Sequence, residues 1–416
     1  MKPAAIESGG MTVPSKGFDS GPELGIAATV AQNLHERLKL VAGVAAKHAD
    51  AVDTGARFPL EAMEAARAQR LLGLAIPIAQ GGEGAPLSDV INACYVLGRA
   101  CSATAMVFAM HQIKIACLTG HTGDSAWLQA FQSRVAMGQL LLASSTTEGQ
   151  AGGDVRVSAA GLEPAPSGFK LKRAATVISY GAQADGVLTT ARRSPDAAPN
   201  DQVLVALERH HYSLAPLAGW QTLGMRGTCS AGFDMVAEGE LVQVFPVPYH
   251  VIHARTMMPV AHLTWSAVWA GIAAGALERA RKFVRMAAAR SSGQLPPGAA
   301  KLAQGAMTLR SLRHTILGSL AAYEAALAQG DAIDSMTIQA ELNLLKVNAS
   351  ELATSTVLSA LAATGLTGYR NDSEFSVGRH LRDVLSSGIM INNDRILANA
   401  AGGLMLSEVP QSLSRP

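Results

Sequence analysis

Apolar residues recur at helical spacing along the first third of the chain. The pattern predicts helices over 24–51, from Leu60 onward, over 87–110 and over 113–137. An interruption is expected near Gly120–Gly123, where two glycines flank His121 and Thr122. The first third is therefore predicted to be all helical.

The pattern changes after Gly138. From there to about Val251 the apolar runs are short, rich in β-branched residues and separated by turns, which is typical of strands. The clearest runs are Phe169–Leu171, Thr176–Ile178, Gly186–Thr189, Gln202–Leu207 and Gly232–Val236. A small β domain is therefore expected between two helical halves.

After Arg255 the helical pattern returns. It predicts four long helices, as in an antiparallel four-helix bundle; they span 257–290, 298–329, 334–364 and 375–404. The expected fold class is α+β, with a helical N-terminal domain, a middle β barrel or sandwich, and a C-terminal four-helix bundle. The expected boundaries are a disordered lead-in over 1–23 and domains over 24–138, 139–251 and 252–416.

Composition narrows the class of protein. The net charge of the 416 residues is +2 and no basic tract occurs, so a nucleic-acid partner is not expected. Four cysteines without a C-x-x-C pair indicate reduced thiols in a cytoplasmic protein. The N-terminus lacks the apolar core of a signal peptide, and the apolar stretch 259–277 is interpreted as a buried helix rather than a membrane span.

One stretch stands at the centre of this organisation. Leu141–Val155 starts as an apolar strand, becomes hydroxyl-rich at Ser144–Thr147 and ends in glycines. Such a strand end offers backbone N–H groups and small donors to a flat or anionic ligand. A plain polar turn after a core strand is the alternative.

Eight motifs follow one another in a distinctive order. They are Phe58–Pro59, Ile76–Gly84, Thr146–Asp154, Val177–Asp185, Leu223–Ser230, a helix that ends at Arg290, Gly365–Tyr369 and Arg382–Asp383. This succession, over about residues 25–405, resembles the acyl-CoA dehydrogenase family of flavoproteins. The resemblance implies the fold described above and FAD as the cofactor.

The resemblance also implies a flavin site. Ser144, Thr146 and Thr147 would lie along the flavin, with Gly152 and Gly153 near the pyrophosphate. The remaining candidates that match the family's cofactor positions are Val177, Ile178, Ser179, Arg290, Gly365, Gly368 and Asn393. Val177 replaces a tryptophan of the family, so one aromatic wall of the ring is missing. Arg290 is either a phosphate ligand across a subunit interface or a solvated helix cap.

The catalytic base is where the chain departs from the family. Ile391 occupies the position of the family's glutamate, and Thr264 occupies the alternative position on the first helix of the bundle. Neither is a carboxylate. Asp394, His262 and Glu374 are possible substitutes, each with a purely structural alternative. Arg226 could orient a substrate anion or hold a structural ion pair.

Three hypotheses follow from the resemblance. The first is oxidation of an acyl thioester, on CoA or an acyl-carrier protein, by a homotetramer or homodimer that passes electrons to an electron-transfer flavoprotein. The second is a flavin-dependent monooxygenase that uses reduced flavin and O₂ and needs no α-proton base. The third is a non-catalytic binding subunit. The sequence shows no metal-ligand spacing, and His210–His211 is expected in a solvated loop.

Overall fold

A computed structural model describes residues 22–149 and 155–405 of the chain. Helices make up its N-terminal part: α1 (Pro22–Thr54), α2 (Leu60–Ala68), α3 (Leu87–Ala100), α4 (Ser102–Gly120) and α5 (Ala126–Gly138), with short 3₁₀ turns at η1 (Leu71–Gly73) and η2 (Ile78–Gln80). The all-helical prediction for this part is confirmed.

The helix predicted over 87–110 is wrong in one respect, because it is divided at Cys101. The backbone of Cys101 is extended (φ −151°, ψ 115°). Its N–H closes the last turn of α3 on Leu97 O, and its carbonyl accepts the first bond of α4 from Ala105. α4 then runs without a break through Ile113 to Gly120.

Two small sheets form the middle of the chain. The first has the order β1 (Leu142–Ser145), β4 (Gly186–Arg192) and β5 (Gln202–Glu208), with β1 parallel to β4. The second is antiparallel, in the order β2 (Glu163–Ala165), β3 (Gly168–Ala175), β7 (Gly232–Gly239) and β6 (Tyr212–Ala218). β4 and β5 are buried almost throughout, whereas β3 alternates buried and exposed residues, so one face of its sheet meets solvent.

The C-terminal part is a helical bundle. It contains α6 (Tyr249–Ile252), the π-helical turn η7 (His253–Met257), α7 (Met258–Arg290), α8 (Ala299–Ala328), α9 (Met336–Thr364), α10 (Leu366–Tyr369), α11 (Gly378–Val384), α12 (Ser386–Ile389) and α13 (Asn393–Leu404). The first three predicted helices correspond to α7, α8 and α9. The fourth, predicted over 375–404, is wrong as one element, because it is three short helices. The break between α12 and α13 falls where Met390 is extended (ψ 112°) and Ile391 has φ +43°.

α7 is the core helix of the molecule. The helical segment Tyr249–Arg290 is long and apolar enough to cross a membrane, but 89% of its apolar window is buried inside the structure. Gly271 of α7 faces Gly98 of α3, and a Cβ at Gly271 would lie 2.4 Å from Tyr95 O. Glycine therefore allows the two helix backbones to touch. This burial is what a core helix of a soluble protein shows.

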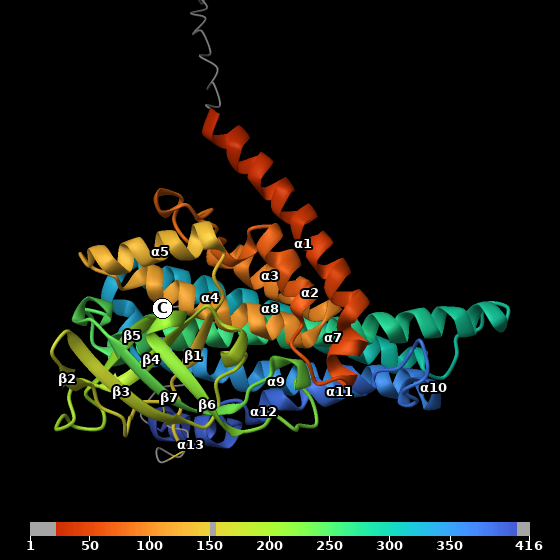
Figure 1. Ribbon diagram of the computed structural model, residues 1–416. Coiled ribbons are helices and arrows are strands. Elements are labelled where there is room, and N and C mark those ends of the chain that lie inside the picture. The colour runs from red at the N-terminus through yellow and green to blue at the C-terminus, as the bar shows by residue number, and fades with distance from the viewer. Residues whose placement is uncertain (1–21, 150–154, 406–416) are drawn as a thin grey trace, which may run out of the picture.

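The layers are visible in Figure 1. The strands gather at one side, with α4 and α5 over them and the C-terminal helices α9, α12 and α13 on the opposite side. α7 passes through the middle. Segments from all three parts of the chain therefore meet along one border between sheets and helices.

Candidate active site

A cavity of about 750 Å³ lies at this border. Its size is within the range of cofactor and ligand sites. Side chains from α4, β1, η7, α7 and the turns around α12 line it, together with some residues of the segments 176–179 and 220–230. The cavity thus collects segments that are far apart in the sequence.

Hydroxyls form one wall of the cavity. Ser144, Thr146 and Thr147, predicted to lie along a flavin, all line it. The start of β1 is fixed by His111, whose Nδ1 accepts from the Leu142 N–H at 3.0 Å while Nε2 donates to Leu72 O at 2.8 Å. Ser144 therefore lies in a strand whose start is anchored, and Thr146 and Thr147 follow directly after that strand.

Glu148 holds the next part of this wall in place. Its carboxylate accepts from the Ala159 N–H at 2.5 Å and from Ser158 Oγ at 3.2 Å, and it lies 3.3 Å from the buried Arg173 guanidinium. It does not line the cavity. Glu148 therefore ties the residues after Thr147 to the segment that leads into β2, which is a structural role.

A second row of hydroxyls continues the wall. Ser230 Oγ bonds Ser179 Oγ at 2.8 Å and Thr228 Oγ1 at 2.8 Å. Val177 also lines the cavity and is 38% exposed. Ile178 is fully buried in the core, and its backbone N–H donates to Ala231 O. Of the three residues predicted to cover the ring, Val177 and Ser179 lie at the cavity and Ile178 supports them from behind.

Another part of the lining is apolar and aromatic. It is formed by Met106, Met110, Ile113, Met258 and Trp265. A lining that combines neutral hydroxyls with apolar side chains fits a flat tricyclic flavin, which presents polar edges and apolar faces. Within the described residues, no aspartate or glutamate lines the cavity.

The position of the family's glutamate is also on the cavity wall. Ile391 lines the cavity, with φ +43° in the turn between α12 and α13. Lys346 of α9 holds this turn, since its Nζ donates to Ile391 O at 2.9 Å and to Asn393 Oδ1 at 2.7 Å. Burial lowers the pKa of Lys346 to about 8. Lys346 thus fixes the turn, and the turn presents the aliphatic side chain of Ile391 to the cavity.

The other base candidates lie elsewhere. Thr264 is buried and donates its hydroxyl to Val260 O at 2.7 Å, within α7. Asp394 is exposed in the first turn of α13 and does not line the cavity, and neither does Glu374. His262 does line it. Of the proposed substitutes, the structure brings only this histidine to the site.

The two ring nitrogens of His262 differ in their hydrogen bonding. Nδ1 bonds Leu342 O of α9 at 2.9 Å, so Nδ1 carries the proton. Nε2 is buried and has no hydrogen-bond partner in the described part of the chain. Burial lowers the pKa of His262 to about 4, so the ring is neutral at pH 7.

Lys114 also lines this cavity. It is 2% exposed, and its Nζ contacts Met257 Sδ at 3.6 Å. Burial lowers the pKa of Lys114. The sequence does contain a signal for it: a single lysine within the apolar helix 102–120. Sequence reasoning missed both Lys114 and Lys346, which is likewise a lone lysine in an apolar helix.

Arg226, a catalytic candidate, and the remaining described cofactor candidates do not line the cavity. Arg226 is half-buried and reaches Thr54 O at 3.5 Å, and Arg290 is exposed at the end of α7. Gly365 ends α9 and Gly368 lies in α10. Asn393 lines a separate hollow of about 570 Å³ beside α8 and α9. Gly152 and Gly153 lie outside the described residues.

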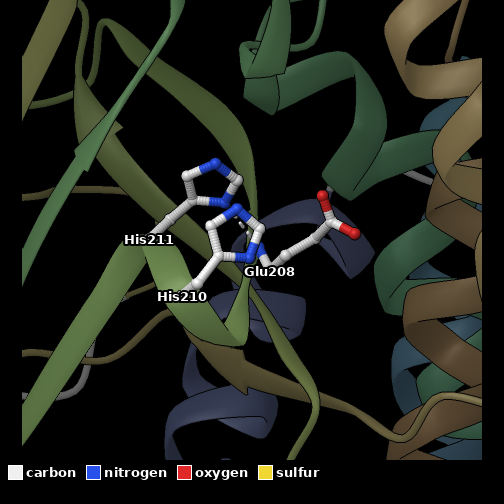
Figure 2. A group of neighbouring side chains, drawn as sticks. All are labelled: Glu208, His210 and His211. Atoms are coloured by element: carbon white, nitrogen blue, oxygen red, sulfur yellow. Dashed lines mark hydrogen bonds between the residues drawn. The ribbon is translucent and has the colours of Figure 1, made fainter.

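Figure 2 shows the histidine pair after β5. Glu208, His210 and His211 place ligand atoms within 4.8 Å of one another. The Glu208 carboxylate already pairs with Arg134 at 2.9 and 3.1 Å, and His211 Nδ1 accepts from the Glu208 N–H. A metal would have to displace Arg134, so this cluster is better described as a capped turn.

Fold and cavity together define a flavoprotein class. The chain matches the model of the acyl-CoA dehydrogenase N-terminal domain over residues 35–139 and that of the C-terminal domain over residues 263–389. It belongs to the acyl-CoA dehydrogenase-like superfamily, as the order of its motifs predicted.

Individual relatives give a finer comparison. The chain is 28% identical over 375 residues to L-evernosamine nitrososynthase of a Micromonospora species, which covers 84% of this chain and 85% of the relative. Its fold is similar to FMN-bound TdsC from Paenibacillus sp. A11-2, with a TM-score of 0.77, 18% identity and coverage of 91% and 98%. KijD3 in complex with FMN and a dTDP-linked 3-amino-4-keto sugar has a TM-score of 0.74, 21% identity and coverage of 92% and 94%.

Proposed function

We propose that this protein is a flavin-dependent monooxygenase that consumes reduced flavin and O₂. One oxygen atom is transferred to a heteroatom of the substrate and the other leaves as water, while the two electrons and two protons of the reduced flavin are used up. The flavin supplies the activation of O₂. The protein's residues bind the ring, exclude water and orient the substrate.

The observation that carries this proposal is the absence of a carboxylate among the described cavity-lining residues. Dehydrogenation of an acyl thioester requires a base to remove the α-proton, and that base must lie within hydrogen-bond reach of the proton. Ile391 and Thr264 cannot serve, because one is aliphatic and the other bonds its own helix. Oxygen transfer to a heteroatom lone pair has no such requirement.

The relatives support the same choice. The relative that is 28% identical is named a nitrososynthase, and TdsC is named a dibenzothiophene monooxygenase. Acyl-thioester oxidation, with CoA or acyl-carrier protein as carrier and an electron-transfer flavoprotein as acceptor, becomes the alternative. A non-catalytic subunit is disfavoured by the intact hydroxyl wall.

The form of the flavin is part of the proposal. Two similar structures hold FMN. FAD, implied by the family resemblance, would need further contacts for its adenosine half, and Arg290, Gly365 and Gly368 are the candidates for them. None of these three residues lines the cavity. They could contact FAD only if its adenosine half extends beyond the cavity, or if they belong to a neighbouring copy of the chain. We therefore infer a homo-oligomer if FAD binds, and a cytoplasmic location in keeping with four free thiols.

A direct test uses the purified protein with reduced FMN and reduced FAD in separate reactions. After O₂ is admitted, a monooxygenase forms an oxygenated product only when a substrate amine or sulfide is present. Without substrate, the reduced flavin is oxidised with release of peroxide. Anaerobic bleaching of the oxidised flavin by an acyl-CoA panel would instead establish the dehydrogenase.

A further inference from the structure

We propose that Lys114 and Tyr249 form an anion subsite in the cavity, which binds the carboxylate of a substrate whose remaining body is apolar. The subsite rests on the proposed monooxygenase function and deepens it, because it assigns the group by which the substrate is anchored. Lys114 comes from α4 and Tyr249 from α6, and both line the cavity. Both residues bind the substrate and take no part in oxygen transfer.

Two buried hydrogen-bond donors meet at one weak acceptor in this part of the cavity. Lys114 Nζ lies 3.6 Å from Met257 Sδ, and the Tyr249 hydroxyl donates to the same sulfur at 3.4 Å. A thioether is a weak acceptor, whereas an ammonium group carries three N–H donors. Among the described residues, no oxygen atom accepts a hydrogen bond from Lys114 Nζ. The surrounding side chains therefore leave donor capacity that a ligand oxygen can use.

Lys114 also lacks a counter-ion. It is 2% exposed, and no aspartate or glutamate among the described residues lines the cavity. Burial lowers the pKa of Lys114, whereas a neighbouring carboxylate would raise it. The nearby Cys117 thiol supplies no charge at pH 7, since burial raises its pKa to about 11. Folding has already removed the lysine from water, so a bound carboxylate adds its attraction without a second desolvation of the amine.

The same face of α4 is apolar beyond the amine. Met110 and Met106 precede Lys114 by one and two helical turns, and all three residues line the cavity. Methionine side chains adapt to apolar ligands of irregular shape. This helix face therefore offers a single polar end beside an apolar surface, which matches a ligand with one carboxylate on an apolar body.

The turn that carries Met257 is held from two sides. Met257 is the last residue of the π-helical turn η7, and such turns are frequent at functional sites. His121 Nε2 bonds Thr256 Oγ1 at 2.8 Å, and the Tyr323 hydroxyl of α8 donates to Arg255 O at 2.9 Å. The backbone around the sulfur is thus fixed without any ligand, and the two donors beside it are already in place for a ligand oxygen.

Calorimetry measures binding to this subsite without turnover. The FMN-loaded protein, with its flavin oxidised, is titrated with 4-(methylthio)benzoate and with the uncharged 4-(methylthio)benzamide, which has nearly the same shape. A hydrogen bond between charged groups predicts that the carboxylate binds about tenfold more tightly than the amide, or better. Equal affinities, or no binding of the carboxylate to the flavin-loaded protein, would overturn the proposal.

Substitutions locate the binding. Lys114→Met keeps the length of the side chain but removes its charge, so it should weaken carboxylate binding about tenfold or more and change amide binding by less than about twofold. Tyr249→Phe removes a neutral donor and should weaken carboxylate binding about two- to tenfold. Lys301→Met, at an exposed position on α8, should change neither affinity.

Unchanged carboxylate binding in Lys114→Met would show that the anion binds elsewhere, and the proposal would fail. Because this substitution removes a buried amine and adds no volume, the variant is expected to fold. The measurement is also independent of the proposed reaction. Carboxylate binding without any oxygenated product would overturn the monooxygenase function alone, whereas an oxygenated product without preference for the carboxylate would overturn the anion subsite alone.

Discussion

At the scale of single residues, buried histidines support the site. His111 bridges α4 to η1 and to the first residue of β1 through both ring nitrogens. Burial lowers its pKa to about 4, as it does for His262. Neutral histidines of this kind make the cavity lining sensitive to acid.

Acid should therefore destabilise the protein already at pH values above those at which carboxylates titrate. The unfolded chain takes up a proton on each histidine near pH 6.5, whereas the folded chain resists it until about pH 4. The free energy of unfolding should thus fall as pH drops through this window, by up to about 3 kcal/mol per histidine. Denaturant titrations at several pH values measure this slope.

Two histidine variants test which residue causes this pH dependence of the free energy of unfolding. His111→Gln should be less stable at pH 7 but should lose less stability on acidification than the wild type. His35→Gln, at an exposed position on α1, should leave the slope unchanged. If His111→Gln and His35→Gln had the same acid slope as the wild type, His111 would not be a neutral buried group.

At the scale of elements, the crossing of α3 and α7 depends on two glycines. Gly271→Ala would place a Cβ 2.4 Å from Tyr95 O and 2.9 Å from the Cα of Gly98, and backbone cannot give way there. We expect a loss of about 2 kcal/mol or more in the free energy of unfolding. Thermal and denaturant unfolding measure it.

Gly43→Ala on α1 is the matched control. No atom lies within 4 Å of its Cβ, and the residue is exposed in the middle of a helix. Alanine should stabilise there by about 0.5–1 kcal/mol. Equal effects of the two substitutions would mean that α3 and α7 do not pack as closely as described.

A second element is the turn between α12 and α13. Lys346→Met would leave Ile391 O and Asn393 Oδ1 without the donor that holds them. We expect a loss of about 2–3 kcal/mol in stability and weaker flavin binding, since Ile391 lines the cavity. Flavin fluorescence and chemical unfolding measure the two effects. Lys301→Met, at an exposed site, should change neither stability nor flavin binding. If Lys346→Met also changed neither, other contacts would hold the turn.

Sequence patterns predicted the long elements well and the short ones poorly. α7, α8 and α9 follow from apolar spacing because each is long and packed along most of its length. The breaks at Cys101 and Ile391 do not follow from it, because neither residue is a glycine or a proline. Extended or left-handed backbone at such positions is imposed by tertiary packing, which no local pattern records.

At the scale of the whole molecule, the order of the motifs identified the superfamily before any geometry was known. It did not reveal the cavity, whose walls join Lys114, Ser144, His262 and Ile391, residues that lie up to 277 positions apart in the sequence. The missing carboxylate was visible in the sequence as Ile391 and Thr264. Only the assembled cavity shows that no other described residue replaces it. The boundaries near 138 and 251 remain proposals that limited proteolysis can test.

The central claim is that the flavin in this cavity reacts with O₂ rather than with an acyl thioester. The most direct measurement supplies reduced FMN, ¹⁸O₂ and a panel of amines and sulfides to the purified protein and follows the products by mass spectrometry. We predict an oxygenated product that carries one ¹⁸O atom, together with no anaerobic bleaching of the oxidised flavin by acyl-CoA. Rapid bleaching by an acyl-CoA, with an enoyl thioester as product and no ¹⁸O in any amine or sulfide, would contradict the account.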